Sequence, residues 1–144
     1  MKKLIIAAAM FVSLNTFANE EKVNSRVLYA FQNEFTTATE VEWKAATDYY
    51  MASFNMNGQR VSAYYNMDGH LMGITRNISS TQLPVALQNT LKKNYSGSWI
   101  SDLFEVANNN GTSFYVTLET GNSKIVLQSA NGSDWSTYKR ERKI

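Results

Sequence analysis

The chain has 144 residues, with 14 Lys and Arg, 12 Asp and Glu, and no cysteine. The missing thiols exclude disulfides, thiol catalysis, thiolate metal sites and lipid attachment at a lipoprotein cysteine. The length suits one compact domain or two very small ones that share a core. Two basic residues lie in the first 18, so the remainder carries 12 basic (14 − 2) and 12 acidic residues. We therefore predict no nucleic-acid partner on electrostatic grounds.

Residues 1–18 have the layout of a secretory signal peptide. Two lysines precede an apolar run over residues 4–14, and Thr16 and Ala18 place small residues at the −3 and −1 positions of a cleavage site. The apolar run is too short to span a bilayer, although an N-terminal anchor helix is the alternative. We expect a processed, unlipidated protein of 126 residues (144 − 18), without a membrane span, in the periplasm or outside the cell.

A polar leader at residues 19–24 precedes a first helix-and-strand segment at residues 25–78. Apolar residues from Val27 to Phe35 recur at helical spacing, and Asn24 or Ser25 suits the N-cap. Alternation then predicts strands, with Val41 and Trp43 sharing a face and two hairpin turns at Asn-Gly and Asp-Gly pairs. The expected strands cover residues 40–44, 49–56, 60–66 and 71–76.

A second helix-and-strand segment is expected at residues 79–139. Pro84 suits a first helical turn, and Leu83, Leu87 and Leu91 recur every four residues before the helix ends near Tyr95. The expected strands cover residues 100–106, 112–119, 124–128 and 135–139, followed by a solvated basic tail at residues 140–144.

Glycine spacing predicts that these two segments repeat one unit. Gly58 and Gly121 are 63 positions apart (121 − 58), as are Gly69 and Gly132 (132 − 69). We predict an α+β fold, a tandem repeat of two helix-plus-four-antiparallel-strand units, with helices on one sheet face. The residues expected to be buried beneath the helices are Phe31, Phe35, Trp43, Phe54, Leu87, Leu91 and Phe114.

The phase of the strand at residues 124–128 stays open. Aligning the turn glycines matches Ala63 with Val126, whereas Ile125 and Leu127 look like the core pair. A slip of one residue exchanges the two faces of a strand.

The run VLYAFQNEFTTATEVEW, the later DYYxAxFxxNG and VSAYYNMDGHLMG stretches, and the LPxxL helix opening resemble the beta-lactamase-inhibitor-like, PepSY-like domain family. The resemblance extends from about Val27 to Lys139. It implies a small exported protein of the Gram-negative envelope, with a concave sheet face open to solvent. In the inhibitor that lends the family its name, that face grips a partner enzyme.

Tyrosine pairs suggest a binding surface on the open face. Neighbouring strand residues point to opposite faces, so one tyrosine of each pair leaves the helix-covered side. The side chains predicted to bind a partner are Tyr49, Met51, Tyr64 and Tyr115, with Arg60 at the rim. Exposed tyrosine is enriched at protein interfaces, which favours an exported non-catalytic module that binds a protein or peptide. The family resemblance implies that such binding can be inhibitory. Alternatively, the tyrosines only pack across strands, as in a structural envelope module without a specific partner.

Catalytic, metal and cofactor sites are not expected. His70 is the only histidine, and it sits two residues from Asp68 in a tight turn where an oriented triad is hard to build. An enzyme that uses His70 is therefore the third-ranked hypothesis. Glu40 and Glu42 share a strand face but are more typical of a solvated strand than of paired catalytic carboxylates. A basic run at residues 139–143 could touch anionic lipid or polysaccharide, although a solvated terminus is the commoner explanation.

Overall fold

The structure is a computed structural model that describes residues 17–18 and 23–143. The expected signal peptide lies outside the described residues except for Phe17 and Ala18. The backbones of these two residues pair with Lys44 and Trp43. Cleavage after Ala18 remains a prediction.

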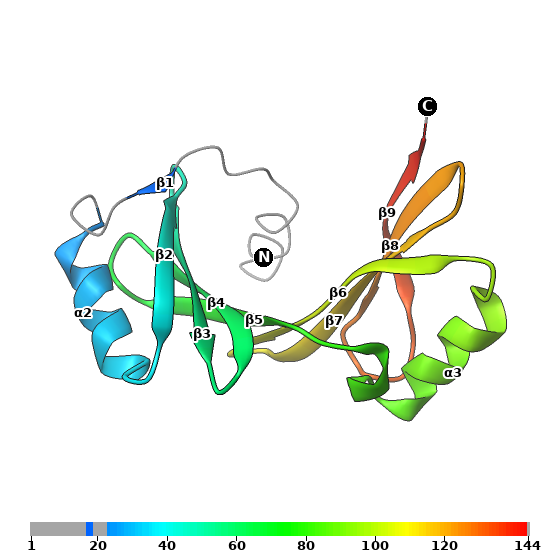
Figure 1. Cartoon of the computed structure of the whole chain (residues 1–144), viewed down its shortest axis with the longest axis horizontal. Helices are drawn as coiled ribbons and strands as arrows, with labels where there is room; N and C mark the ends of the chain where they lie inside the picture. Colours follow the sequence, from blue (N-terminus) through cyan, green and yellow to red (C-terminus); the bar gives the residue numbers. More distant parts are fainter. Residues whose placement is uncertain (1–16, 19–22, 144) are drawn as a thin grey trace. The chain divides into compact units, whose positions relative to one another are not determined.

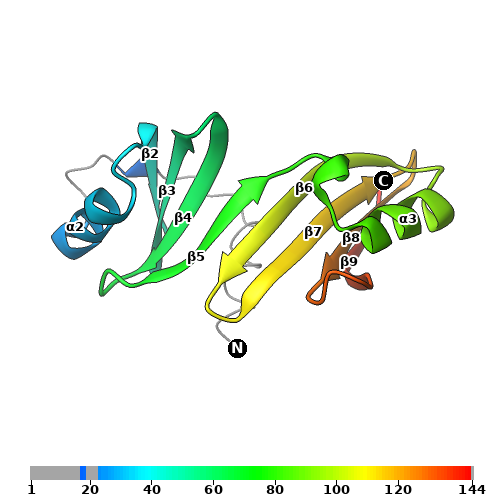
Figure 2. The ribbon, with the colours of Figure 1, turned by 90° about the horizontal axis from the view of Figure 1, so that it is seen from below.

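The described residues contain nine strands, two α-helices and one short 3₁₀ helix (Figures 1 and 2). The helices are α2 (Ser25–Glu34), η2 (Ser80–Gln82) and α3 (Val85–Asn94). The strands are β1 (Phe17–Ala18), β2 (Thr39–Ala45), β3 (Tyr49–Met56), β4 (Gln59–Asn66), β5 (Leu71–Asn77), β6 (Trp99–Asn108), β7 (Gly111–Glu119), β8 (Ser123–Ser129) and β9 (Ser136–Arg142). The chain divides into two compact units, residues 1–76 with 108–110, and residues 77–107 with 111–144.

The predicted tandem repeat of helix-plus-four-strand units is wrong. The strands belong to one sheet whose order is the chain order, β1 to β9, and the fold is mostly β. Gly58 and Gly69 flank β4, and Gly121 and Gly132 flank β8, so the equal spacings require only that these two strands with their turns have similar lengths. The equal glycine spacings therefore reflect similar strand and turn lengths, and they do not show a duplicated architecture.

The turns themselves differ between the two halves of the chain. Met56 pairs with Gln59 around a two-residue turn, and Asn57 and Gly58 both have positive φ, 52° and 79°, as a type I′ turn requires. By contrast, Glu119 pairs with Lys124, so four residues separate β7 from β8.

The longer β7–β8 loop explains the open phase of β8. Leu118 pairs with Ile125 and Val116 with Leu127, and all four join the core of the second unit. Because the loop holds two more residues than the β3–β4 turn, glycine alignment assigned the wrong face to β8.

Each helix packs on one face of its own unit's strands. Asn24 caps α2, since its side-chain oxygen accepts a hydrogen bond from the Arg26 N–H at 2.8 Å. In the second unit, Trp135 Nε1 donates to the Leu87 carbonyl oxygen in α3 at 3.1 Å. The seven residues predicted to be buried under the helices are confirmed as core residues.

Two local expectations differ from the structure. Val41 is exposed, unlike Trp43, because β2 is bulged between Thr39 and Glu42 and loses strict alternation. The expected basic tail is strand up to Arg142, because β9 continues its pairing with β8 that far.

Candidate functional site

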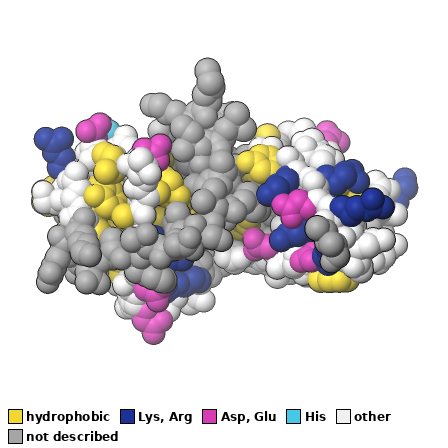
Figure 3. Space-filling model, turned by 90° about the horizontal axis from the view of Figure 1, so that it is seen from above, with side chains coloured by type: hydrophobic (Ala, Val, Ile, Leu, Met, Phe, Trp, Pro, Cys, Tyr) yellow, Lys and Arg dark blue, Asp and Glu magenta, His cyan; other side chains and the backbone are white. Residues whose placement is uncertain are grey.

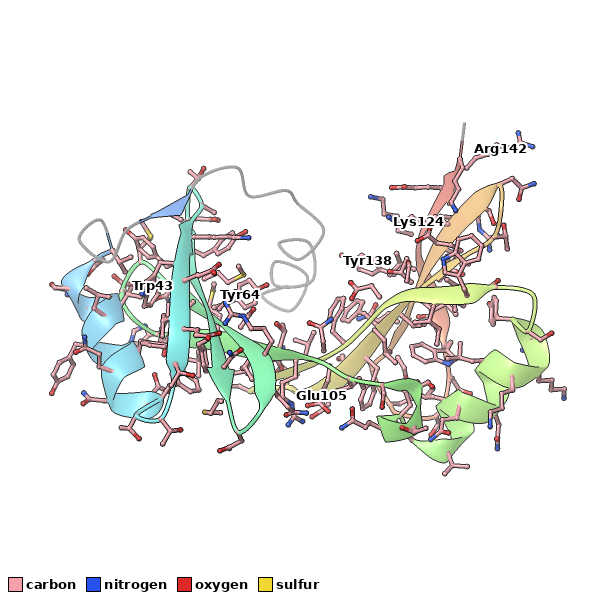
Figure 4. The ribbon with its side chains drawn as sticks, in the orientation of Figure 1. Trp43, Tyr64, Glu105, Lys124, Tyr138 and Arg142 are labelled. Atoms are coloured by element: carbon pink, nitrogen blue, oxygen red, sulfur yellow. The ribbon has the colours of Figure 1, made fainter. Side chains whose placement is uncertain are left out.

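Tyr49, Met51 and Tyr64 lie on the sheet face that points away from α2 in the first unit. Met51 pairs directly with Tyr64 across β3 and β4, so their side chains are neighbours on one face. Figure 4 shows Trp43 directed toward α2 and Tyr64 on the other side of the strands. The structure therefore brings together three of the five residues predicted to bind a partner.

Aromatic and hydroxyl groups contact one another within this face. The rings of Tyr49 and Tyr64 lie 6.0 Å apart, and the hydroxyls of Ser53 and Ser62 are hydrogen-bonded at 3.1 Å. Burial raises the pKa of Tyr64, as does its neighbour Tyr49, while a hydrogen bond with Thr75 lowers it. Burial and then the Asp48 charge raise the pKa of Tyr49. Both phenols therefore stay neutral at physiological pH.

The four predicted anchor side chains are little exposed in the complete 144-residue chain. Their exposed fractions run from 3% for Tyr115 to 8% for Met51. In Figure 3, hydrophobic side chains gather over the first unit, whereas Lys and Arg gather with a few acidic groups over the second.

Arg60 is tied to the edge of the first unit. Its Nη1 donates to the Glu40 carbonyl oxygen at 3.0 Å and to Asn55 Oδ1 at 3.2 Å, and its Nη2 donates to the Ser53 carbonyl oxygen at 3.3 Å. Its Nη2 also lies 3.9 Å from Glu42 Oε1. Arg60 thus links β2, β3 and β4 beside the bulge, where Glu40 has a φ of +52°. Arg60 therefore stabilises the edge of the first unit, in addition to the binding role predicted for it.

Tyr115 occupies the corresponding face of the second unit, opposite α3. Its ring stacks on Phe104 with centroids 5.2 Å apart and meets Tyr138 edge-on at 5.4 Å. Gln128 Nε2 donates to the Tyr115 hydroxyl oxygen at 2.8 Å. Burial, then the nearby Tyr138, raise the pKa of Tyr115 to about 12, although the Gln128 hydrogen bond lowers it.

Raising the pH through the tyrosine range should destabilise this unit, and Tyr115→Phe should reduce the loss. Folded Tyr115 keeps its proton up to about pH 12, whereas in the unfolded chain it ionises near pH 10. The unfolded state then binds fewer protons, so stability falls as pH rises through this window. Thermal melts of the wild type and of Tyr115→Phe between pH 9 and pH 11.5 measure this loss of stability. An equal fall in Tm for both would contradict the raised pKa.

Sequence reasoning missed the partners of Tyr115. Phe104 and Val106 are both buried and two residues apart on β6, a spacing that places them on one face. That spacing was visible in the sequence. Tyr138 was harder to assign, because the β8–β9 register shifts between Val126 and Leu127.

The catalytic and metal hypotheses gain nothing from the structure. His70 is exposed in the β4–β5 turn, where its backbone N–H donates to Asn66 Oδ1 at 3.0 Å. Asp68 faces Arg26 in an exposed pair at 4.0 Å. Within residues 17–18 and 23–143, no three His, Cys, Asp or Glu side chains are grouped to hold a metal ion. The helices of that part of the chain are also too short or too polar to cross a membrane.

Solved structures share this fold. A BLIP-like protein from Bacteroides fragilis NCTC 9343 matches with a TM-score of 0.70 and 19% identity over 83% of this chain and 86% of that one. A DUF2874 family protein from Bacteroides uniformis ATCC 8492 matches with a TM-score of 0.73 and 18% identity, over 83% and 89%. A protein from Bacteroides eggerthii DSM 20697, provisionally described as periplasmic, matches with a TM-score of 0.72 and 16% identity, over 83% and 88%.

At these identities the likeness establishes a BLIP-like fold and nothing finer. A comparison with protein families finds no match, and neither does a comparison with curated proteins. The beta-lactamase-inhibitor-like part of the sequence resemblance is thus supported at the level of fold, whereas its PepSY-like part is not.

Proposed function

We propose that the processed protein is a non-catalytic binding module of the cell envelope that holds a protein or peptide partner on its aromatic sheet face. The observation that carries the proposal is the direct pairing of Met51 with Tyr64, beside the Tyr49 ring, on the face away from α2. Tyrosine supplies rigid contact area at low entropic cost, and anchors of this kind dominate many interfaces. The likeness to the BLIP-like protein from Bacteroides fragilis supports a binding role by analogy only.

Location in the periplasm or outside the cell belongs to the same proposal. Its support is the signal-peptide layout of residues 1–18 and the provisional periplasmic description of the Bacteroides eggerthii protein. A specific interface usually buries at least about 1,000 Å², so a partner must cover much more than the three anchors.

A structural envelope module is the second candidate function. The low exposed fractions of Tyr49, Met51 and Tyr64 favour it, because side chains that stabilise a sheet across strands need no partner. The two functions differ in one measurable property, the access of solvent to this face after processing.

Hydroxyl-radical footprinting of the chain from residue 19 onward separates the two. Tyr29 is 70% exposed and Tyr65 is fully buried, so they provide internal references for open and closed tyrosines. We expect Tyr49, Met51 and Tyr64 to be oxidised faster than Tyr65 in the processed chain. Protection of all three at the level of Tyr65 in the processed chain would favour the structural module.

A further inference from the structure

A basic groove lies on the second unit, on the same side of the strands as α3. It has a volume of about 410 Å³. Tyr95 and Ser98 line it from the loop after α3, and Arg140 and Arg142 line it from β9. The groove is therefore on the opposite face from Tyr115, and it plays no part in the proposed function.

Strand register aims both arginines at this groove. Arg140 pairs with Ile125, which belongs to the core under α3, and Arg142 pairs with Ser123 two residues away. Residues two apart on a strand share a face, about 7 Å from each other. Figure 4 shows Arg142 and Lys124 on opposite sides of β8 and β9, as this alternation requires.

These two guanidinium groups lack the partners that neighbouring cations have. Lys139 Nζ contacts Glu141 Oε1 at 2.8 Å, and Lys143 Nζ contacts Glu119 Oε1 at 2.8 Å. Glu141 also borders the groove, but Lys139 holds the pKa of this carboxyl below its usual range and balances its charge. Among the described residues, neither arginine makes an ion pair or a side-chain hydrogen bond. The groove thus presents two uncompensated positive charges.

The rest of the lining identifies the kind of anion that fits. Ser98 offers a hydroxyl group, and Asn122 and Ser123 offer the amide and hydroxyl capacity that their hydrogen bonds with Thr120 Oγ1 leave over for a polar ligand. Tyr95 and Ile125 add apolar surface. A bare phosphate or sulfate would leave this surface unused.

We propose that the groove binds an acidic sugar, such as a uronic acid unit of an anionic saccharide. Its carboxylate lies between Arg140 and Arg142, which donate charge-assisted hydrogen bonds. Its hydroxyls bond with the serine and asparagine groups, and the apolar face of its ring packs on Tyr95. The groove volume falls in the range of small-molecule sites, about 300–1,000 Å³. The competing explanation is that edge-strand arginines only prevent edge-to-edge association.

An NMR titration of the protein with trigalacturonate tests the proposal, with neutral galactotriose and inorganic phosphate as comparison probes. We expect trigalacturonate to shift the amide signals of residues 95–98, 122–125 and 140–142, and galactotriose to bind at least about tenfold more weakly. Arg140→Gln/Arg142→Gln should weaken trigalacturonate binding by at least about tenfold, since charge-assisted hydrogen bonds are lost.

Lys124→Gln is the matched control, because it removes a positive charge from the other face of the same sheet and should leave binding unchanged. Equal binding by the double arginine variant would overturn the proposal, and so would equal affinity for galactotriose. Phosphate binding without trigalacturonate binding would also overturn it, since the site would then recognise a simple oxyanion. Chemical shifts outside the groove report whether each variant remains folded.

Discussion

Phe54→Ala is expected to lower the free energy of unfolding by about 3–5 kcal/mol. Phe54 has no exposed surface, and its ring centroid lies 5.2 Å from that of Phe31 and 4.9 Å from that of Phe35. Truncation removes the buried ring, leaves a cavity against α2 and breaks two aromatic contacts. A small domain of ordinary stability has little more than this to lose.

Urea denaturation of the processed chain measures this effect. Tyr29→Ala is the matched control. Tyr29 is also an aromatic residue of the first unit and lies within α2, but its side chain is 70% exposed. We expect the control to change stability by no more than about 0.5 kcal/mol. Wild-type stability for Phe54→Ala would mean that α2 does not pack on this face of the strands.

Gly69→Ala is expected to cost about 2–4 kcal/mol, from a left-handed backbone and a steric clash together. Gly69 has a φ of +87°, and an added Cβ would lie 2.9 Å from the Arg26 carbonyl oxygen in the first turn of α2. Neither the helix backbone nor the turn can move without disturbing the other. This glycine therefore sets how closely the β4–β5 turn approaches the helix.

Gly58→Ala separates the two contributions. Gly58 also has a positive φ, +79°, but an added Cβ there would meet no atom within 4 Å. We expect only the backbone cost, about 1–2 kcal/mol. Equal losses for the two variants in the same denaturation experiment would show that the contact with Arg26 carries no energy.

Most of the strands could be predicted from the alternation of apolar and polar residues. Trp43, Phe54 and Phe114 were assigned to the buried face because period-two spacing holds wherever a strand is regular. The same argument failed at Val41, because a bulge breaks the period and no single residue announces it. Alternation also could not reveal how the strands order into one sheet, since that depends on pairings between distant parts of the chain.

The candidate sites were predictable to different degrees. The placement of Tyr49 and Tyr64 on one face followed from their positions within paired strands. The basic groove did not follow, because residues 140–144 were expected to be a solvated tail. Its assembly needs β9 to continue to Arg142 and the loop after α3 to lie beside it.

Affinity capture from the native cell envelope tests the central claim most directly. The processed wild-type chain is compared with Tyr49→Ala/Tyr64→Ala, and with Tyr29→Ala/Val85→Ala, which truncates exposed side chains on the two helices. Thermal melts establish that each variant is folded, and Met51→Gln replaces the double tyrosine variant if that one unfolds. We expect wild type and the helix variant to retain the same partner, and the variant of the aromatic face to lose it. Identical capture by all three folded proteins would contradict binding through this face.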